Sequence, residues 1–354
     1  MLIQKHIEIV RSSIPGLSSL SLVSAQAMQE LLSRHYQQVH IATVDCVADL
    51  EALVLRHPDL VFMGMKFVPV NTLRGFQDPN KVWLASFLDD QGIAYTGSDH
   101  VAHRRELNKH LAKARVAKHG LKTAHYRVIK QTSAPLEVKL DLTFPVFIKP
   151  TDRGGGQGID SQSVAHNFEQ LEAKVQSIST QTKSDSLVEE YLPGREFSVA
   201  ILKDELSNAF SVMPLELIAP LDQNGSRLLS AAVKVSDNER VIAVTDPVLG
   251  DQLSELALSS FHALEARDYG RIDIRLDTNG VPHFLEANLI PSLIDGYGNF
   301  PKACQLNQAL DYETMLLRIV NLGLSRQTES LSLDDSLVDD LTLFNPLSAV
   351  EPLV

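Results

Sequence analysis

The stretch 270–293, GRIDIRLDTNGVPHFLEANLIPSL, constrains the fold of this chain more than any other segment. Two runs in which apolar and polar residues alternate flank the pair Asn279-Gly280. Asn-Gly between such runs is a strong hairpin signal, because both central residues of a type I′ turn need positive φ angles. The segment therefore predicts two antiparallel strands joined by a two-residue turn.

With that turn, polar side chains gather on one face of the hairpin. Asp273 lies directly opposite Glu286, and Arg271 lies opposite Asn288. Cross-strand neighbours lie about 4.5–5.5 Å apart, so two facing carboxylates repel unless a cation separates them. Carboxylate and amide oxygens suit magnesium carried by nucleotide phosphates better than zinc or copper. The other face carries four apolar residues, Ile272, Ile274, Leu285 and Ala287.

A solvated hairpin face is the alternative, since charged and apolar residues also alternate where one side of a sheet is wet. The hairpin alone does not exclude it. The rest of the chain therefore has to supply the nucleotide-binding features that a magnesium site of this kind requires.

The bulk composition narrows the class of protein. A chain of 354 residues is long enough for two or three domains, and a net charge of −12 disfavours binding to nucleic acid or to an anionic membrane. Cys46 and Cys304 are the two cysteines, which excludes a disulfide framework and a thiolate zinc site. No stretch approaches the roughly 20 apolar residues of a membrane span. We expect a cytoplasmic protein without nucleic-acid or membrane partners.

Residues 1–100 predict a parallel α/β domain, because helical and strand-like segments alternate along them. The predicted helices are 25–35, 49–56 and 82–91, and the predicted strands are 40–44, 60–63 and 93–98.

A basic helix and a glycine loop follow. The helix over 106–119 carries Lys109, Lys113 and Lys118, and we expect Lys113 and Lys118 on a solvated face. The segment 144–159, FPVFIKPTDRGGGQGI, brings Lys149 to the end of a strand before a glycine-rich loop. Glycines let backbone N–H groups approach phosphate oxygens, and the lysine adds positive charge. A flexible linker has a similar composition, but the strand and lysine before the loop favour a phosphate site.

The remaining pattern predicts more sheet and two more helices. Residues 186–202 read as two strands joined by Pro193-Gly194, and 212–218 and 228–235 read as further strands. Residues 251–268 and 308–322 predict helices, the second packing back on the first domain. The acidic end from residue 325 predicts a peripheral tail, with a homodimer contact as an alternative use.

Taken together, the YTGS sequence at 95–98, the basic helix, the lysine–glycine loop and the hairpin resemble the ATP-grasp fold, most closely that of the D-alanine–D-alanine ligases. The resemblance implies an α/β (α+β) fold in which two subdomains hold a nucleotide. It divides the chain into an N-terminal α/β domain (1–100), a central subdomain (101–195), a C-terminal subdomain (196–324) and an acidic tail (325–354).

The resemblance also implies site residues. ATP and two Mg²⁺ ions, with Mn²⁺ as an alternative, are the expected cofactors. Metal ligands would be Asp273, Glu286 and Asn288, and catalytic residues would be Arg271, Lys149 and Ser292. For Arg271, an ion pair with Asp273 that merely orders the hairpin is the alternative. Lys109, Lys149, Gly155 and Gly156 would bind the phosphates, and Lys234 would be a further phosphate ligand. Glu189 and Leu192 would contact the adenine, and Glu196 would hold the ribose.

The implied activity is ATP-dependent ligation of small-molecule substrates, in which a carboxylate becomes an acyl phosphate and an amine displaces phosphate. Three alternatives stay open: a nucleotide-binding relative without turnover, a kinase that stops at the acyl phosphate, and a true D-alanine–D-alanine ligase.

Several positions depart from the ligase pattern at the substrate end. Ser292 stands in place of a glycine that contributes to the oxyanion hole, and Tyr297 stands in the neighbourhood of a substrate-binding serine. Leu20 aligns loosely with the glutamate that receives the amine of the first D-alanine, and Lys66 lies where a histidine–glycine motif is usual. These departures predict a carboxylate substrate other than D-alanine.

Overall fold

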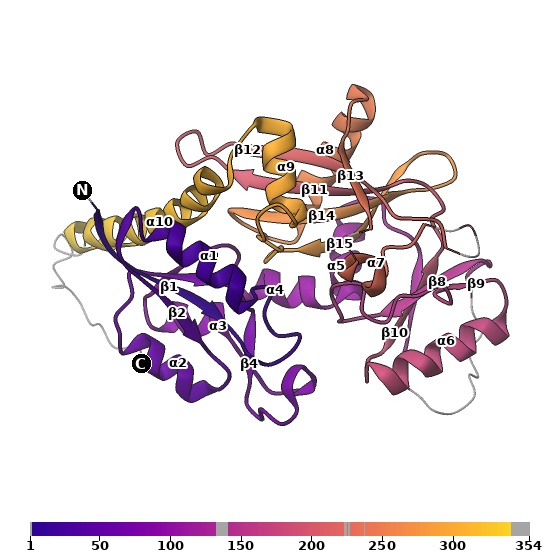
Figure 1. The fold of residues 1–354 in the computed structure, drawn as a ribbon, viewed down its shortest axis with the longest axis horizontal. Coiled ribbons are helices and arrows are strands. Elements are labelled where there is room, and N and C mark those ends of the chain that lie inside the picture. Colours follow the sequence, from indigo (N-terminus) through magenta and orange to yellow (C-terminus); the bar gives the residue numbers. More distant parts are fainter. Residues whose placement is uncertain (1, 132–140, 223–224, 226, 237, 341–354) are drawn as a thin grey trace, which may run out of the picture.

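The computed structural model describes residues 2–131, 141–222, 225, 227–236 and 238–340, with side chains for all of these except 234–235 and 327–340. Three sheets organise the chain (Figure 1). The N-terminal sheet, drawn in indigo, lies beside helix α10, and two antiparallel sheets follow along the sequence. The predicted α/β class is confirmed.

The N-terminal sheet is parallel and has the strand order β2-β1-β3-β6. Its strands are β1 (Ile3–Arg11), β2 (Tyr36–Thr43), β3 (Leu60–Met63) and β6 (Ala94–Tyr95), and its helices are α1 (Leu22–Leu32), α2 (Val47–Val54) and α3 (Leu84–Asp90). Strand β1 was not predicted, because charged residues interrupt its apolar pattern. The structure explains this, since the fully buried Glu8 pairs with Arg56 at 2.6 Å.

The helix predicted over 82–91 begins two residues later, at Leu84, because residues 82 and 83 belong to a small hairpin. That hairpin pairs β4 (Phe67–Pro69) with β5 (Lys81–Trp83), and the short helix η1 (Gly75–Gln77) lies between them.

The prediction of one helix over 106–119 is wrong. Two helices, α4 (His100–Leu107) and α5 (Lys109–Lys118), meet at Asn108, whose backbone is extended with φ −108° and ψ 97°. The break turns the start of α5 toward the glycine loop, where the backbone N–H of Lys109 donates to the carbonyl of Thr151 at 2.9 Å.

The central sheet has the order β7-β10-β8-β9 and is antiparallel. It comprises β7 (Tyr126–Ile129), β8 (Val146–Pro150), β9 (Val164–Ala165) and β10 (Ser186–Glu190), with α6 (Phe168–Gln181) packed on it.

The third sheet has the order β13-β12-β11-β14-β15. Its strands are β11 (Glu196–Lys203), β12 (Phe210–Ile218), β13 (Arg240–Ala243), β14 (Tyr269–Leu276) and β15 (Pro282–Asn288), and its helices are α7 (Ala231–Val235), α8 (Pro247–Ala263) and α9 (Asn299–Gln308). The strand predicted over 228–235 is wrong, because the second half of that segment is the short helix α7.

The β14–β15 hairpin has the predicted pairing but not the predicted turn. Gly280 has φ +77°, whereas Asn279 does not have a positive φ, so the turn centres on Thr278 and Asn279 and the type I′ prediction is wrong. The pairing near the turn is consequently shifted by one residue from the predicted register, so that Arg275 lies opposite His283. A bulge at Leu285 restores it, and Asp273 faces Glu286 as predicted. Leu285 is thereby moved from the expected apolar face into a cavity.

Helix α10 (Tyr312–Asp340) returns to the N-terminal sheet, as predicted for 308–322. The hydroxyl of Tyr36 donates to Asn321 at 3.0 Å, and His35 lies 2.5 Å from Glu313. The helix continues beyond residue 325, where a tail was expected, and residues 341–354 lie outside the described part.

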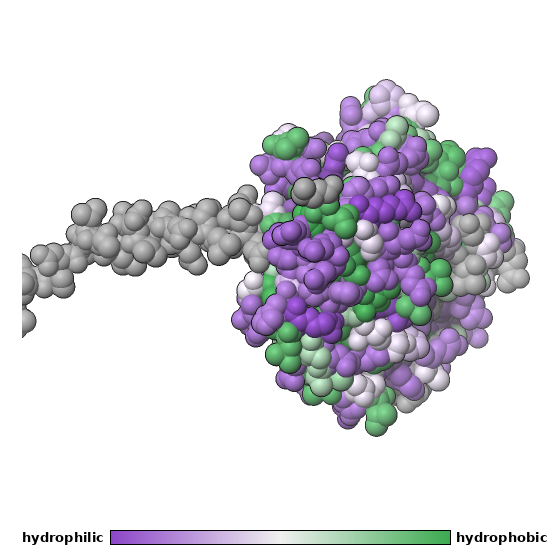
Figure 2. Space-filling view, turned by 60° about the vertical axis from the view of Figure 1, so that its left-hand side comes forward, coloured by the Kyte–Doolittle hydropathy of each residue, from purple (hydrophilic) through white to green (hydrophobic). Residues whose placement is uncertain are grey.

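The face of the molecule in Figure 2 is mainly hydrophilic, with apolar side chains in small scattered groups. Such groups are ordinary on a protein surface. Within the described residues, no helix has the length and apolar character needed to cross a membrane.

Candidate active site

A cavity between the central and C-terminal sheets collects most of the predicted site residues. It is lined from the helix α5 and strand β8 side by Lys109 and Lys149, and from the hairpin side by Arg271, Asp273 and Glu286. The predicted nucleotide residues Gly156, Glu189, Leu192 and Glu196 line it as well. Gly155 lies in the loop beside Gly156. Lys234 has its backbone in α7, and its side chain lies outside the described residues.

A buried carboxylate joins two lysines at the base of this cavity. Glu189, which is 2% exposed, pairs with Lys149 at 2.7 Å and with Lys113 at 2.7 Å. Lys113 also donates to the hydroxyl of Thr123 at 2.8 Å. The expectation that Lys113 lies on a solvated face is therefore wrong, whereas Lys118 is exposed as predicted.

The pKa values of this cluster follow from burial and pairing. Burial would raise the pKa of Glu189, but the two lysines outweigh burial and lower the pKa. Burial would lower the pKa of Lys149, but the carboxylates of Glu189 and Glu286 outweigh it and raise the pKa. For Glu189 and Lys149, pairing thus favours the charged form over the neutral one. For Lys113, burial dominates and lowers the pKa.

The glycine loop packs against the segment before α7. A Cβ atom on Gly156 would lie 2.8 Å from the carbonyl oxygen of Leu229 and 2.7 Å from the backbone nitrogen of Ala231. Gly156 has φ +76°, a conformation that side chains disfavour. Glycine is thus required here for a close approach of two backbones. Lys109 fixes the other end, since its ammonium donates to the carbonyl of Arg153.

The hairpin presents its carboxylates already paired with cations. Arg271 donates to both oxygens of Asp273, from Nε at 2.9 Å and from Nη2 at 2.9 Å. Ser198 and the amide nitrogen of Asn288 donate to the same carboxylate at 2.8 and 3.0 Å. Glu286 lies 3.4 Å from the ammonium of Lys109. The ion pair considered for Arg271 is therefore present.

The donor set fits a magnesium–nucleotide complex. The facing carboxylates of Asp273 and Glu286 supply hard oxygen ligands, and the amide oxygen of Asn288 is a third donor of that kind. The cavity lining contains five basic and five acidic side chains, so its formal charge is balanced. A polyanionic nucleotide is thus better accommodated when it brings divalent cations with it.

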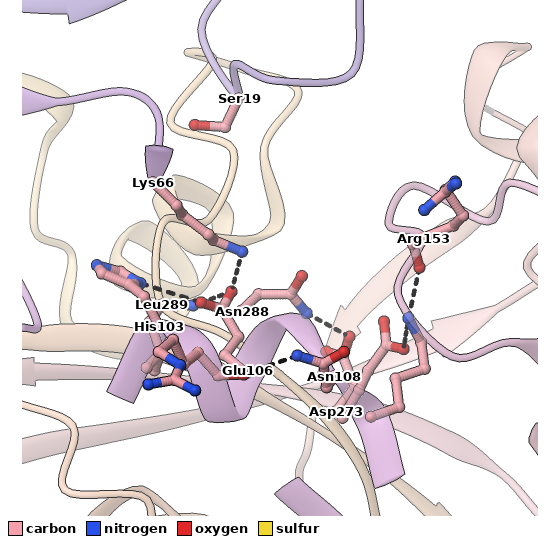
Figure 3. A network of polar contacts seen from close by, with 12 residues as sticks. Ser19, Lys66, His103, Glu106, Asn108, Arg153, Asp273, Asn288 and Leu289 are labelled. Atoms are coloured by element: carbon pink, nitrogen blue, oxygen red, sulfur yellow. Dashed lines mark hydrogen bonds and ion pairs between the residues drawn. The ribbon is translucent and has the colours of Figure 1, made fainter. Parts of the chain in front are cut away.

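A second polar network lies at the end of the hairpin, below the N-terminal domain (Figure 3). Glu106, at the end of α4, is buried and accepts from Lys66 at 2.7 Å. The same oxygen accepts from the backbone N–H of Leu289 at 2.8 Å, and the other oxygen lies 3.1 Å from His103 Nδ1. Glu106 thus links Lys66 of the N-terminal domain to the segment that follows Asn288.

The charges in this network are also fixed. Burial would raise the pKa of Glu106, but Lys66 and His103 outweigh burial and lower it. Burial lowers the pKa of His103, so the histidine is neutral. Among the predicted substrate-end residues, Ser292 has a buried hydroxyl without a hydrogen-bond partner in the described part of the chain. The ammonium of Lys302 lies over the ring of Tyr297, 5.8 Å from the ring centre.

Sequence reasoning missed several buried charged residues of the site, among them Lys113, Glu106 and Arg275. A signal existed for Arg275, because it follows Arg271 and Asp273 at alternate positions and must share their face. For Lys113, the spacing of four from Lys109 placed both lysines on one face of a helix. No local signal identified Glu106, because two of its three partners, Lys66 and Leu289, lie 40 and 183 residues away.

Comparison with known proteins gives the family. Residues 116–321 match the model of the D-ala D-ala ligase C-terminus. The chain belongs to the D-alanine–D-alanine ligase family. It is accordingly an ATP-binding ligase of the ATP-grasp fold that forms carbon–nitrogen bonds.

Relatives extend the match over most of the chain. An uncharacterized protein, y4sG of Sinorhizobium fredii, is 31% identical over 234 residues, which cover 65% of this chain and 66% of that protein. The D-alanine–D-alanine ligase of Desulfotalea psychrophila is 25% identical over 324 residues, 91% of this chain and 95% of that enzyme. The structure of D-alanine–D-alanine ligase from Bacillus anthracis complexed with ATP shares the fold, with a TM-score of 0.71, 16% identity, and coverage of 92% and 99%.

Replacing Lys113 with methionine tests the buried cluster. Lys113→Met leaves Glu189 with one of its two cations, and losing a partner of a buried charge costs roughly 3 kcal/mol. We expect a clear fall in the thermal unfolding midpoint. Lys118→Met, on the exposed face of the same helix, should change stability by less than about 0.5 kcal/mol. Equal effects of the two substitutions would contradict the cluster.

Proposed function

We propose that this protein joins a small carboxylic acid to an amine in an ATP-dependent reaction, through an acyl phosphate, and releases ADP and phosphate. The observation that supports this most is one cavity that holds Lys109, Lys149 and Arg271 beside the facing carboxylates of Asp273 and Glu286. Bringing a carboxylate against a polyanionic nucleotide requires compensation of negative charge and alignment of the reacting groups.

In this proposal each side chain has a separate task. Lys149 and Lys109 bind phosphate oxygens, together with the backbone of Gly155 and Gly156. Glu189 and Leu192 meet the adenine, and Glu196 holds the ribose. Arg271 stabilises the acyl phosphate, and the N–H of Ser292 contributes to the oxyanion hole. Lys234 is a further phosphate ligand.

Divalent cations complete the site in the same proposal. Asp273, Glu286 and Asn288 would hold two Mg²⁺ ions, for which Mn²⁺ can substitute. Bound there, the ions neutralise the phosphates and polarise the bond to the γ-phosphate. Cytoplasmic location and a homodimer stay predictions of the sequence.

The acid substrate, in this proposal, binds at the carboxyl edge of the N-terminal sheet. In the strand order β2-β1-β3-β6 the chain crosses from one side of β1 to the other, so the direction of winding changes between β1 and β3. Ligands of open α/β sheets bind outside the strand ends at such a crossing. The loops after these two strands meet there, where the N–H of Ser19 donates to the carbonyl of Gly64 at 2.9 Å. Lys66 extends from this edge of the sheet to Glu106.

The groups at this edge of the sheet favour an acid without an ammonium group. Lys66 is a hydrogen-bond donor only, so the substrate atom that it meets must be an acceptor. Glu106 is the carboxylate that reaches Lys66, and both its oxygens already accept hydrogen bonds. Leu20, where an acid was expected from the family pattern, is apolar and 2% exposed. These features support a substrate other than D-alanine at the acid position.

A panel of acids and amines tests this proposal through ADP release. We expect turnover with an acid that lacks an α-ammonium group, and a product mass equal to acid plus amine less water. Lys66→Met should raise KM for that acid about 10- to 100-fold, as expected for losing a charged hydrogen bond, and leave KM for ATP unchanged. Lys118→Met serves as the control. Turnover with D-alanine alone would contradict the altered substrate.

Glutamine at position 286 tests the metal hairpin. Glu286→Gln keeps the shape but removes one charged oxygen ligand, and we expect turnover to fall at least about 100-fold while the protein still folds. Asp251→Asn, an equal charge change at an exposed position of α8, should keep full activity. Retained activity in Glu286→Gln would remove the metal assignment. A protein that binds ATP but never releases ADP would favour the binding relative.

A further inference from the structure

Arg275 is a buried cation in the nucleotide cavity to which the proposed reaction assigns no task. It is 7% exposed and lines the cavity together with Tyr191, Leu192 and Glu196. Removing a guanidinium from water is costly unless carbonyl or carboxylate groups accept from its N–H donors. The partners of Arg275 therefore indicate what the side chain does.

All three guanidinium nitrogens donate, each to a different part of the cavity wall. Nε donates to the carbonyl of Gly194 at 3.2 Å, in the connection between β10 and β11. Nη1 donates to Glu196 Oε2 at 2.9 Å. Nη2 donates to the carbonyl of Arg227 at 3.0 Å, next to the wall residue Leu228. The guanidinium is thus fixed in its plane by three segments.

This arrangement fixes the direction of the Glu196 carboxylate. Arg275 lies directly opposite Glu196 in the β11–β14 pairing, and their side chains are 9% and 17% exposed, so water screens the ion pair little. A guanidinium is planar and cannot rotate about its contacts as an ammonium does. The carboxylate oxygen held by Nη1 is therefore fixed relative to the cavity wall.

We propose that Arg275 is a positioning residue that orients Glu196 to accept hydrogen bonds from the ribose hydroxyls of the nucleotide. It thereby sets the preference of this site for ribonucleotides over nucleotides without these hydroxyls. The inference rests on the proposed function, in which Glu196 holds the ribose. A hydrogen bond to a charged partner corresponds to about 10- to 100-fold in affinity, which is the preference that Arg275 secures.

A purely structural role for Arg275 would have a different effect on nucleotide binding. If Arg275 only ties the three segments together, its removal weakens every nucleotide by the same factor. If it orients Glu196, removal weakens ATP, whereas a nucleotide without ribose hydroxyls loses little. The comparison of two nucleotides therefore separates the two roles.

The test measures binding of ATP and of 2′,3′-dideoxy-ATP to the full chain with Mg²⁺, with acid and amine omitted so that no ligation occurs. We expect the unaltered protein to bind ATP about 10- to 100-fold more tightly. In Arg275→Met this preference should fall below about 3-fold, with dideoxy-ATP affinity nearly unchanged. Arg275→Lys keeps the charge but loses the planar contacts, and should lose most of the preference as well.

Arg195→Met is the matched control. Arg195 lies in the same connection and pairs with Glu216 at 2.8 Å, but its side chain is 52% exposed. It should keep the full preference for ATP. A melting curve of each variant checks folding, and Arg275→Lys carries the test if Arg275→Met does not fold.

Two results would overturn the inference alone: equal loss of both nucleotides in the Arg275 variants, or no preference in the unaltered protein while ADP release still accompanies ligation. Failure of the unaltered protein to bind ATP at all would overturn the proposed function together with this inference.

Discussion

The compensation of two facing carboxylates is the constraint on which the cleft depends. Asp273 and Glu286 lie opposite one another on adjacent strands, where equal charges repel. Arg271 and Lys109 neutralise them in this structure, and the remaining charges of the cavity are balanced too. A nucleotide entering this cleft has to bring cations of its own, which is why nucleotide and metal belong to one binding event in the proposed reaction.

The pairing at the centre of the hairpin could be predicted from sequence, although the prediction was right for an incomplete reason. The turn is one residue away from the expected one, and the bulge at Leu285 compensates for it before the strands reach Asp273. The alternation of polar residues therefore identified the face that carries Asp273 and Glu286, while the local turn signal did not identify the turn. A bulge of this kind depends on packing around the strand and leaves little trace in the sequence.

The residues that could not be predicted from sequence are buried charged side chains whose partners lie far away along the chain. Lys113 looks like a surface lysine until Glu189, 76 residues away, is placed beside it by the sheet. Glu8 in β1 and Glu106 in α4 are similar cases, since each is buried only because a cation from another element reaches it. Family resemblance supplied the candidate nucleotide and metal residues, whereas these supporting partners required the fold.

The most direct test of the central claim is to locate Mn²⁺ in crystals grown with a non-hydrolysable ATP analogue, using anomalous scattering at the manganese edge. We expect manganese density between the carboxylates of Asp273 and Glu286, with Arg271 moved away from Asp273. Manganese bound elsewhere, with Asp273 still paired with Arg271 and Glu286 still beside Lys109, would contradict it.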